Sequence, residues 1–154
     1  MTISESDIYI TGNLEGLPCS ESNISRWIQS LLATEESLEK LISKKVINFS
    51  FVSKIEIQEL NRRFSNKDKP TNVLSFPSPL ANKEDLLGDI AICPEIIKFE
   101  AHDQKKSEIN HLTHIILHSV LHLAGFDHEE EDSAAKMELL EIKALQKIGI
   151  ANPY

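Results

Sequence analysis

The stretch HLTHIILHSVLHLAGFDH, residues 111–128, holds five of the six histidines of this 154-residue chain. We predict a helix over about 107–124. His118 and His122 are four residues apart, so they share one face of that helix and can bind one ion between them. Gly125 favours the left-handed conformation that ends a helix. The chain can turn back there, which leaves His128 in position to supply a third ligand.

Three histidines with an open fourth position are typical of a catalytic zinc site, because structural zinc sites are normally closed by four protein ligands. Neutral imidazole also favours Zn²⁺ over harder ions. The spacing matches the metzincin protease pattern except at Ser119, where the protease has a glutamate that acts as general base. The sequence therefore predicts one Zn²⁺ per chain and argues against peptide hydrolysis. We expect His111 and His114 to be surface residues or to support the ligands.

Strands and helices alternate along the rest of the chain. The hydrophobic pattern predicts strands at 7–11, 46–53, 72–77 and 86–93. It predicts a first helix over 24–32, and residues 38–42 either extend this helix or form a further turn. A second helix runs from the capping box at 53–56 to before Pro70, and a third from Pro94 to a break near 102–106. The last two helices run over 107–124 and from a cap at Asp132 or Ser133 to Gly149. We therefore expect one α+β domain over residues 1–154, with a sheet of about four strands, about five helices and the zinc site at the end of a central helix.

Charge is distributed unevenly along the chain. The whole sequence carries a net charge of −8. Residues 40–70 hold eight lysines and arginines against three acidic residues, a net charge of +5, so the remainder carries −13. Such a segment can form a local phosphate-binding surface or a solvated set of surface charges, and charge alone leaves both interpretations open.

Composition is typical of a globular protein, with 41% hydrophobic and 26% charged residues. No run of 18 apolar residues is present and the first residues resemble no signal peptide, so we expect no membrane association and a cytoplasmic location. Cys19 and Cys93 lie outside any C-x-x-C motif, so no disulfide framework is expected.

Three motifs in order, with a matching tail, resemble the YbeY family of bacterial zinc-dependent rRNA maturation endoribonucleases. The motifs are KDKPTNVLSFP at 67–77, LGDIAIC at 87–93 and HSVLHLAGFDH at 118–128, and the tail matches at Met137, Glu138, Glu141, Gly149, Pro153 and Tyr154. The resemblance implies that His118, His122 and His128 bind zinc in an α+β fold. It implies a single-strand-specific endoribonuclease that acts in 16S rRNA 3′-end maturation and ribosome quality control. Its implied partners are ribosomal RNA, the small ribosomal subunit, a small-subunit ribosomal protein and the GTPase Era.

One departure from the family pattern concerns substrate binding. The family has Leu-Asn-x-x-Tyr/Trp-Arg-Gly-Lys-Asp where this chain reads LNRRFSNKD at 60–68, so Ser65 replaces the arginine and Asn66 the glycine. Serine cannot supply the bidentate charge of arginine to a phosphate. The candidates for RNA contact are Arg62, Arg63, Lys67 and Lys69, and the candidate catalytic group is Asp127.

Two other function classes remain open. The first is a non-catalytic ribosome-assembly factor in which zinc only braces the fold, an interpretation that Ser65 favours. The second is a hydrolase of another substrate that uses the same three histidines, because a fold by itself does not determine a function.

Overall fold

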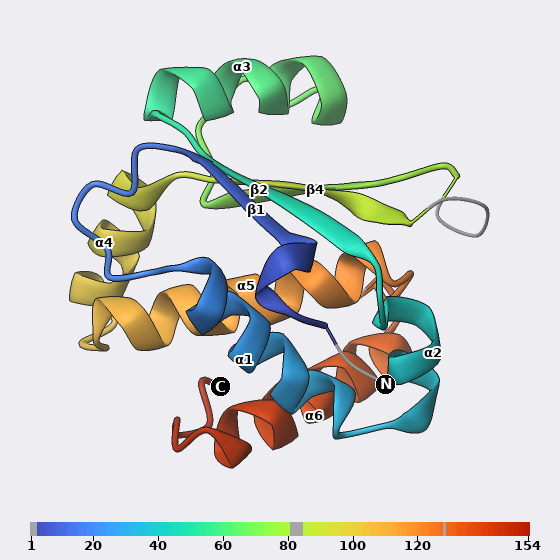
Figure 1. Cartoon of the computed structure of the whole chain (residues 1–154). Helices are drawn as coiled ribbons and strands as arrows, with labels where there is room; N and C mark the ends of the chain where they lie inside the picture. Colours follow the sequence, from blue (N-terminus) through green and yellow to red (C-terminus); the bar gives the residue numbers. More distant parts are fainter. Residues whose placement is uncertain (1–2, 81–84, 128) are drawn as a thin grey trace.

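The computed structural model describes residues 3–80, 85–127 and 129–154. Within these residues the chain forms a four-stranded sheet, six α-helices and one short 3₁₀ helix, η1 (Figure 1). The strands are β1 (Ile8–Gly12), β2 (Val46–Phe51), β3 (Val73–Pro77) and β4 (Leu86–Ile92). The helices are η1 (Glu5–Asp7), α1 (Glu21–Leu32), α2 (Glu36–Ile42), α3 (Lys54–Ser65), α4 (Pro94–Asp103), α5 (Glu108–Leu123) and α6 (Glu131–Lys147).

The sheet has the strand order β1-β2-β4-β3. β1 pairs with β2, and β2 with β4, in parallel, whereas β3 pairs with β4 in antiparallel orientation. In β2, Ile47, Phe49 and Phe51 are buried while the residues between them are half-buried, as the alternating sequence predicts. The antiparallel strand β3 therefore lies at one edge of the sheet.

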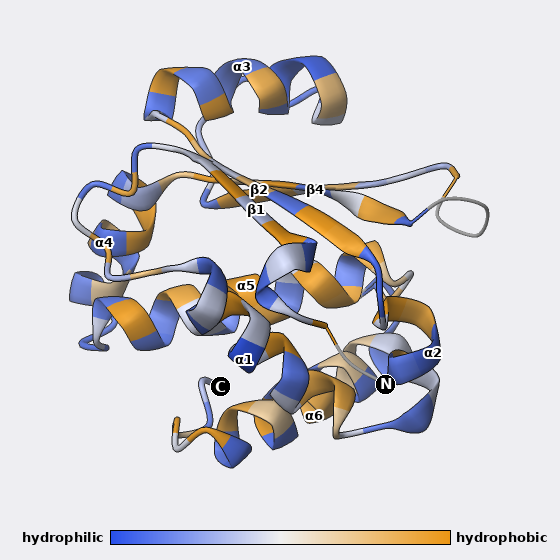
Figure 2. Cartoon of the chain, viewed as in Figure 1, coloured by the Kyte–Doolittle hydropathy of each residue, from blue (hydrophilic) through white to orange (hydrophobic). Residues whose placement is uncertain are grey.

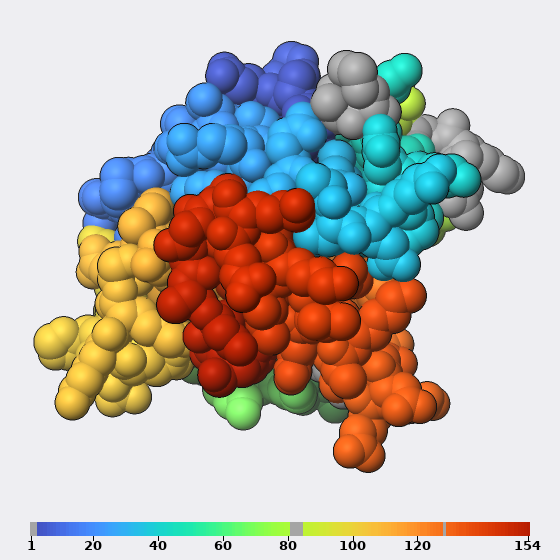
Figure 3. All heavy atoms as spheres, turned by 90° about the horizontal axis from the view of Figure 1, so that it is seen from below, coloured from blue at the N-terminus to red at the C-terminus, as the bar shows by residue number. Residues whose placement is uncertain are grey.

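Helices cover both faces of the sheet. α3 lies on one face, and α5, α1 and α6 lie on the other (Figure 1). α5 is the central helix, and apolar residues alternate with polar ones along it and along the strands (Figure 2). Seen from below, α6 and the C-terminal residues form the middle of the outer surface, flanked by α1 and α4 (Figure 3). Most of the buried apolar residues form one continuous core, in which Leu117 and Leu121 of α5 are completely inaccessible.

The expected number of about five helices was one too low for the described residues, because α2 is separate from α1. The chain leaves α1 at Thr34, whose N–H and hydroxyl both donate to the Leu31 carbonyl, at 3.1 and 2.6 Å. Glu35 is then extended, with φ of −156°, which starts α2 in a new direction. This turn lets Leu38 and Ile42 become fully buried.

Other boundaries differ from the predictions by up to three residues, as at the start of α1. α6 begins at Glu131, so Asp132 lies in the first turn, where an acidic side chain interacts favourably with the helix dipole rather than capping the helix. β2 ends at Phe51 because Ser53 caps α3, accepting a hydrogen bond from the Glu56 N–H at 3.2 Å. The predicted break between α4 and α5 is confirmed, and Lys105 there has a φ of 55°.

Two glycines bring α5 and the sheet into position for the site. Gly125 has a φ of +99° directly after α5, and its N–H bonds to the His122 carbonyl while that of Phe126 bonds to Leu121, both at 3.0 Å. This is the predicted turn after the histidine pair. A Cβ on Gly88 of β4 would lie 2.5 Å from the Phe76 carbonyl oxygen and 2.7 Å from Leu123 Cδ2. Only glycine therefore permits this approach of α5 to β3 and β4.

Two further expectations concern membranes and cysteines. No helix within the described parts of the chain is both long and apolar enough to cross a bilayer. Cys19 and Cys93 are both free thiols, which confirms the absence of a disulfide between them. Burial, together with the nearby Glu21 carboxylate, raises the pKa of the Cys19 thiol to about 12.

Candidate active site

The two histidines predicted to share a helix face do so in the last turns of α5. Their Nε2 atoms are 3.0 Å apart and their ring centroids 4.6 Å apart. Two nitrogen ligands on one tetrahedral Zn²⁺ with bonds of about 2.0–2.1 Å would lie roughly 3.3–3.4 Å apart. The spacing of the His118 and His122 nitrogens, and their chemistry, therefore fit a shared zinc ion.

The third predicted ligand, His128, lies outside the described residues. Among the residues that are described, no group of three His, Cys, Asp or Glu side chains is arranged so that it could hold a metal ion. The role of His128 and the presence of zinc therefore stay predictions.

A buried carboxylate holds His118 in place from behind. Glu141, on α6, is completely inaccessible, and its Oε1 lies 3.2 Å from His118 Nδ1 and 2.7 Å from His114 Nε2. Burial would raise the pKa of Glu141, but its hydrogen bonds with His114 and His118 outweigh this and lower the pKa to about 2. An ionised carboxylate only accepts hydrogen bonds, so His118 carries its hydrogen on Nδ1. Its Nε2 then presents a lone pair on the side of His122.

The last residue of the chain joins this network. The Tyr154 hydroxyl donates to Glu141 Oε1 at 2.9 Å and lies 3.2 Å from His114 Nε2. Burial and the negative charge of Glu141 raise the pKa of Tyr154, so its hydroxyl stays protonated and remains a donor. Oε1 of Glu141 thus accepts three hydrogen bonds, from His114, His118 and Tyr154.

The two upstream histidines of the motif both contact carboxylates. His114 bonds to Glu141, as described, and is largely buried. His111 is only 4% exposed and its Nε2 lies 2.9 Å from Oε1 of Glu100 on α4. The structure therefore places His114 behind the histidine pair and His111 further along the helix, where its contact with Glu100 links α5 to α4.

A cleft of about 560 Å³ opens beside the histidine pair. One wall comes from α5 and the chain terminus, and the other comes from the edge strand β3 and the end of α3. The lining residues are Ser65, Asn72, Val73, Leu74, Ser75, Pro77, His114, Ile115, His118, His122 and Tyr154.

Ser65 and Asn66, the two departures from the family pattern, lie at the end of α3. Ser65 lines the cleft, so the position of the family's arginine faces the site and carries a neutral hydroxyl in this chain. Asn66 caps α3 in the left-handed region, with φ of 56° and ψ of 33°. Asparagine tolerates that conformation better than most residues, so it replaces the glycine without loss of the turn.

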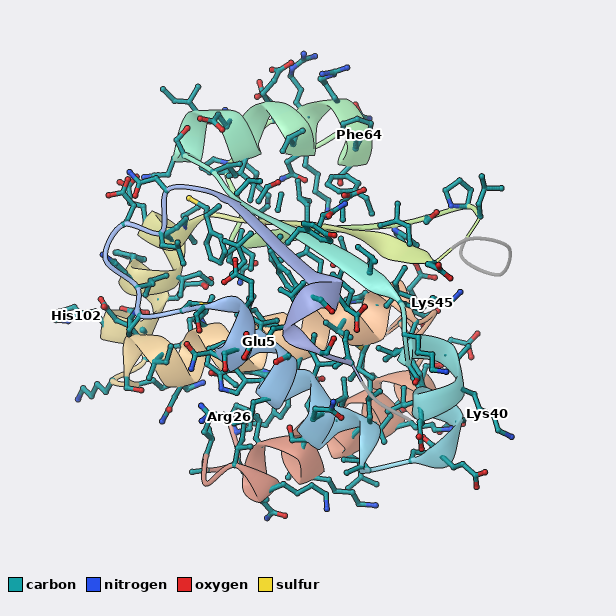
Figure 4. The ribbon with its side chains drawn as sticks, viewed as in Figure 1. Glu5, Arg26, Lys40, Lys45, Phe64 and His102 are labelled. Carbon is teal, nitrogen blue, oxygen red and sulfur yellow. The ribbon has the colours of Figure 1, made fainter. Side chains whose placement is uncertain are left out.

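The four residues predicted to contact RNA are exposed but do not line the cleft. Arg62 is paired with Glu59, its Nε lying 3.0 Å from Oε2. The Arg63 guanidinium lies 5.4 Å from the centre of the Phe64 ring, and Lys67 and Lys69 follow on the loop to β3. The basic segment is also divided in space, because Lys40 and Lys45 lie near α2, far from the end of α3 that carries Phe64 (Figure 4).

The remaining candidates lie off the cleft. Ser119, which occupies the position of the protease glutamate, is completely buried and its hydroxyl donates to the Ile115 carbonyl at 2.7 Å. Asp127 is exposed, and its Oδ1 accepts a hydrogen bond from the Glu129 N–H at 3.3 Å, as a turn carboxylate does. His102, the one histidine outside the motif, points into solvent from α4 (Figure 4).

Sequence reasoning assigned no role to Glu141 or Tyr154. A signal for Glu141 existed, because it falls on the same helix face as Met137 and Ala144, and a carboxylate on a buried face must be paired. Tyr154 gave no comparable signal, since its position depends on the path of the tail after Gly149.

Comparison with known proteins finds relatives over most of the chain. Residues 10–149 match the family described as Endoribonuclease YbeY. The chain is 46% identical over 121 residues to Endoribonuclease YbeY of Francisella tularensis subsp. novicida (strain U112), covering 73% of this chain and 74% of that protein. The protein of the same name from subsp. tularensis (strain FSC 198) is also 46% identical, with 73% and 71% covered.

A solved structure extends the comparison to the fold. The solution structure of TM1509 from Thermotoga maritima is 30% identical, with a TM-score of 0.53 over 92% of this chain and 91% of that one. The α+β fold and the motifs around the histidine pair are thus accounted for together: this chain belongs to the YbeY family of endoribonucleases.

Proposed function

We propose that this protein is a zinc-dependent endoribonuclease that cleaves single-stranded RNA, and that it acts in maturation of the 16S rRNA 3′ end and in ribosome quality control. One observation carries the zinc-dependent part of the proposal. His118 and His122 present their Nε2 atoms 3.0 Å apart at the wall of a cleft of about 560 Å³. Their chemistry suits a zinc ion, and the family supplies RNA as the substrate.

Cleavage of a phosphodiester requires stabilisation of negative charge on the phosphoryl oxygens. Zinc held by His118, His122 and the predicted ligand His128 would supply a Lewis acid for that charge. Glu141 fixes the ring of His118 and the position of its hydrogen, which keeps the lone pair of Nε2 available.

The cleft suits a single strand better than a duplex. The wall formed by β3 and the end of α3 combines apolar Val73 and Leu74 with the serines Ser65 and Ser75. Unpaired nucleotides can place their bases and backbone against such a wall, whereas paired bases are stacked inside a helix. We accordingly propose ribosomal RNA of the small subunit as the substrate, with a small-subunit ribosomal protein and the GTPase Era as partners.

Mapping of rRNA 3′ ends in cells depleted of this protein tests the proposed role. We expect 16S rRNA with unprocessed 3′ ends to accumulate. Wild-type protein should restore the mature end, and His122→Ala should not, while Lys40→Ala, at the far α2 end, should restore it fully. Normal 16S ends after depletion would show that the protein acts elsewhere.

Ser65 supports one other candidate function, a non-catalytic ribosome-assembly factor. This residue puts a neutral side chain into the cleft where the family pattern has an arginine. The same depletion experiment separates the two candidates. Restoration of small-subunit assembly by a His122→Ala protein that is folded but cleaves no RNA would favour the assembly factor.

A further inference from the structure

An aromatic pair, one exposed ring and one half-buried ring, lies where α3 meets the edge strand. The rings of Phe64 and Phe76 meet edge to face, with centroids 5.2 Å apart and planes at 68°. Phe64 is 61% exposed and sits in the last turn of α3 (Figure 4). A large part of one phenyl ring is thus presented to solvent on a rigid support.

The pair borders the candidate active-site cleft. Ser65, the residue after Phe64, lines the cleft, as do Ser75 and Pro77 on either side of Phe76. Side chains alternate between the faces of a strand, so Phe76 points to the α3 face while Ser75 points toward α5. The aromatic pair therefore lies across the edge strand from the histidines, at the α3 side of the cleft.

The contact with Phe76 packs the end of α3 on β3, yet 61% of Phe64 stays exposed. Ile57, on the same helix, is completely buried. Single exposed apolar residues are common on protein surfaces, so exposure alone carries no argument. Phe64 is distinguished by its place beside the cleft and by the Arg63 guanidinium, 5.4 Å from the centre of its ring.

We propose that Phe64, backed by Phe76, is a stacking platform for one base of single-stranded RNA lying in the cleft, with Arg63 contacting an adjoining phosphate. The inference rests on the proposed function, since it concerns the same substrate. Stacking of a base on an aromatic ring tolerates any sequence, because every base has a π-face. Because β3 separates the platform from the histidines, the stacked base is one that flanks the cleaved linkage. It would make the enzyme prefer unpaired RNA, whose bases are free to leave the stack.

The test measures binding of a single-stranded RNA that contains 2-aminopurine, whose fluorescence is quenched when the base stacks. Phe64→Leu should weaken binding about 5- to 10-fold and abolish the quenching, since a leucine keeps apolar contact but has no π-face. Phe64→Trp should retain both. Phe99→Leu is the matched control, because Phe99 is 70% exposed on α4 and does not line the cleft. A fully paired duplex of the same sequence should bind wild type and Phe64→Leu equally.

The outcomes separate this inference from the proposed function. If wild type binds and cleaves the RNA, and Phe64→Leu matches Phe99→Leu in affinity and quenching, the platform does not exist although the endoribonuclease stands. If wild type neither binds nor cleaves single-stranded RNA, both are overturned. Thermal denaturation of each variant identifies any loss of fold. If Phe64→Leu is unfolded, Phe64→Trp is used instead: retained quenching supports the platform, and lost quenching in a folded Phe64→Trp protein contradicts it.

Discussion

At the scale of single residues, Glu141 fixes the orientation of His118 at the candidate metal site. Its fully buried carboxylate joins His118, His114 and Tyr154 through one oxygen. An ordered partner on the far nitrogen of a metal-binding histidine fixes its tautomer and its orientation. Glu141 would therefore influence a zinc ion bound at the candidate site through His118, without lining the cleft itself.

Replacing Glu141 by glutamine should weaken zinc binding about 10- to 100-fold, because the amide is neutral and can turn an N–H toward His118 Nδ1. Competition for zinc with a chromogenic chelator measures this without reference to catalysis. Glu138→Gln on the exposed side of α6 removes the same charge and is the control. Equal zinc affinity in the two variants would remove Glu141 from the site.

At the scale of elements, the site depends on how closely α5 approaches the β3–β4 pair. Gly88 is the point of closest approach, with a potential Cβ 2.5 Å from the Phe76 carbonyl oxygen. The backbone of β3 cannot move away without breaking its pairing with β4.

We expect Gly88→Ala to lower the free energy of unfolding by about 1–3 kcal/mol, the usual cost of overpacking. Gly125→Ala is a useful comparison, because nothing lies within 4 Å of its Cβ and its cost is only the strain of a φ of +99°. Denaturant titrations of both variants give the two free energies. A Gly88→Ala protein as stable as wild type would show that the approach is looser than described.

Glu100 connects α4 to α5 through His111 and to the start of β3 through Asn72. Burial alone would raise the pKa of Glu100, but hydrogen bonds with His111 and Asn72 hold it below the usual value. A carboxyl group whose pKa is lower when folded stabilises the protein above its unfolded pKa of about 4.3, and loses this contribution as the pH falls. The melting temperature should therefore fall less steeply below pH 5 in Glu100→Gln than in wild type or in Glu95→Gln, an exposed control on α4. Parallel profiles in all three proteins would contradict this role.

Helix α5 and its end were predictable because local signals agree there. The apolar spacing, the histidines at i and i+4 and the left-handed turn at Gly125 all act within one short segment. The division of α1 from α2 was not decided by local sequence, since Leu38 and Ile42 fit either a continued or a new helix. The role of Glu141 was hidden for another reason: its partners are 23 and 27 residues away in sequence, and only the packing of α6 on α5 brings them together.

At the scale of the whole molecule, an acidic protein must bind a polyanion. The net charge is −8, and the cleft itself is lined by no lysine or arginine among the described residues. The arginines and lysines at positions 62, 63, 67 and 69 lie at the end of α3 and on the loop to β3, within a few residues of Ser65, which lines the cleft. Electrostatic attraction of RNA therefore has to come from outside the cleft.

Salt dependence of RNA binding measures how many phosphates these charges neutralise. Ser65→Arg places a charge in the cleft and should steepen the log–log salt dependence by about 0.7, the value for one further phosphate neutralised on a single strand. Arg62→Ala/Arg63→Ala should make it shallower by about 0.7 for each phosphate that the variant no longer neutralises. Lys40→Ala/Lys45→Ala, at the α2 end, makes the same change in net charge and should leave it unaltered (Figure 4). Equal slopes in all variants would show that residues 62 and 63 are only a solvated surface.

The rate of single-stranded RNA cleavage as a function of bound zinc tests the central claim most directly. Metal-free protein is titrated with zinc, and zinc content and cleavage rate are measured on the same samples. The rate should rise in proportion to bound zinc and reach its maximum at one zinc per chain, while His118→Ala should bind no stoichiometric zinc and cleave no RNA. Full activity of the metal-free protein, or undiminished cleavage by His118→Ala, would contradict the account.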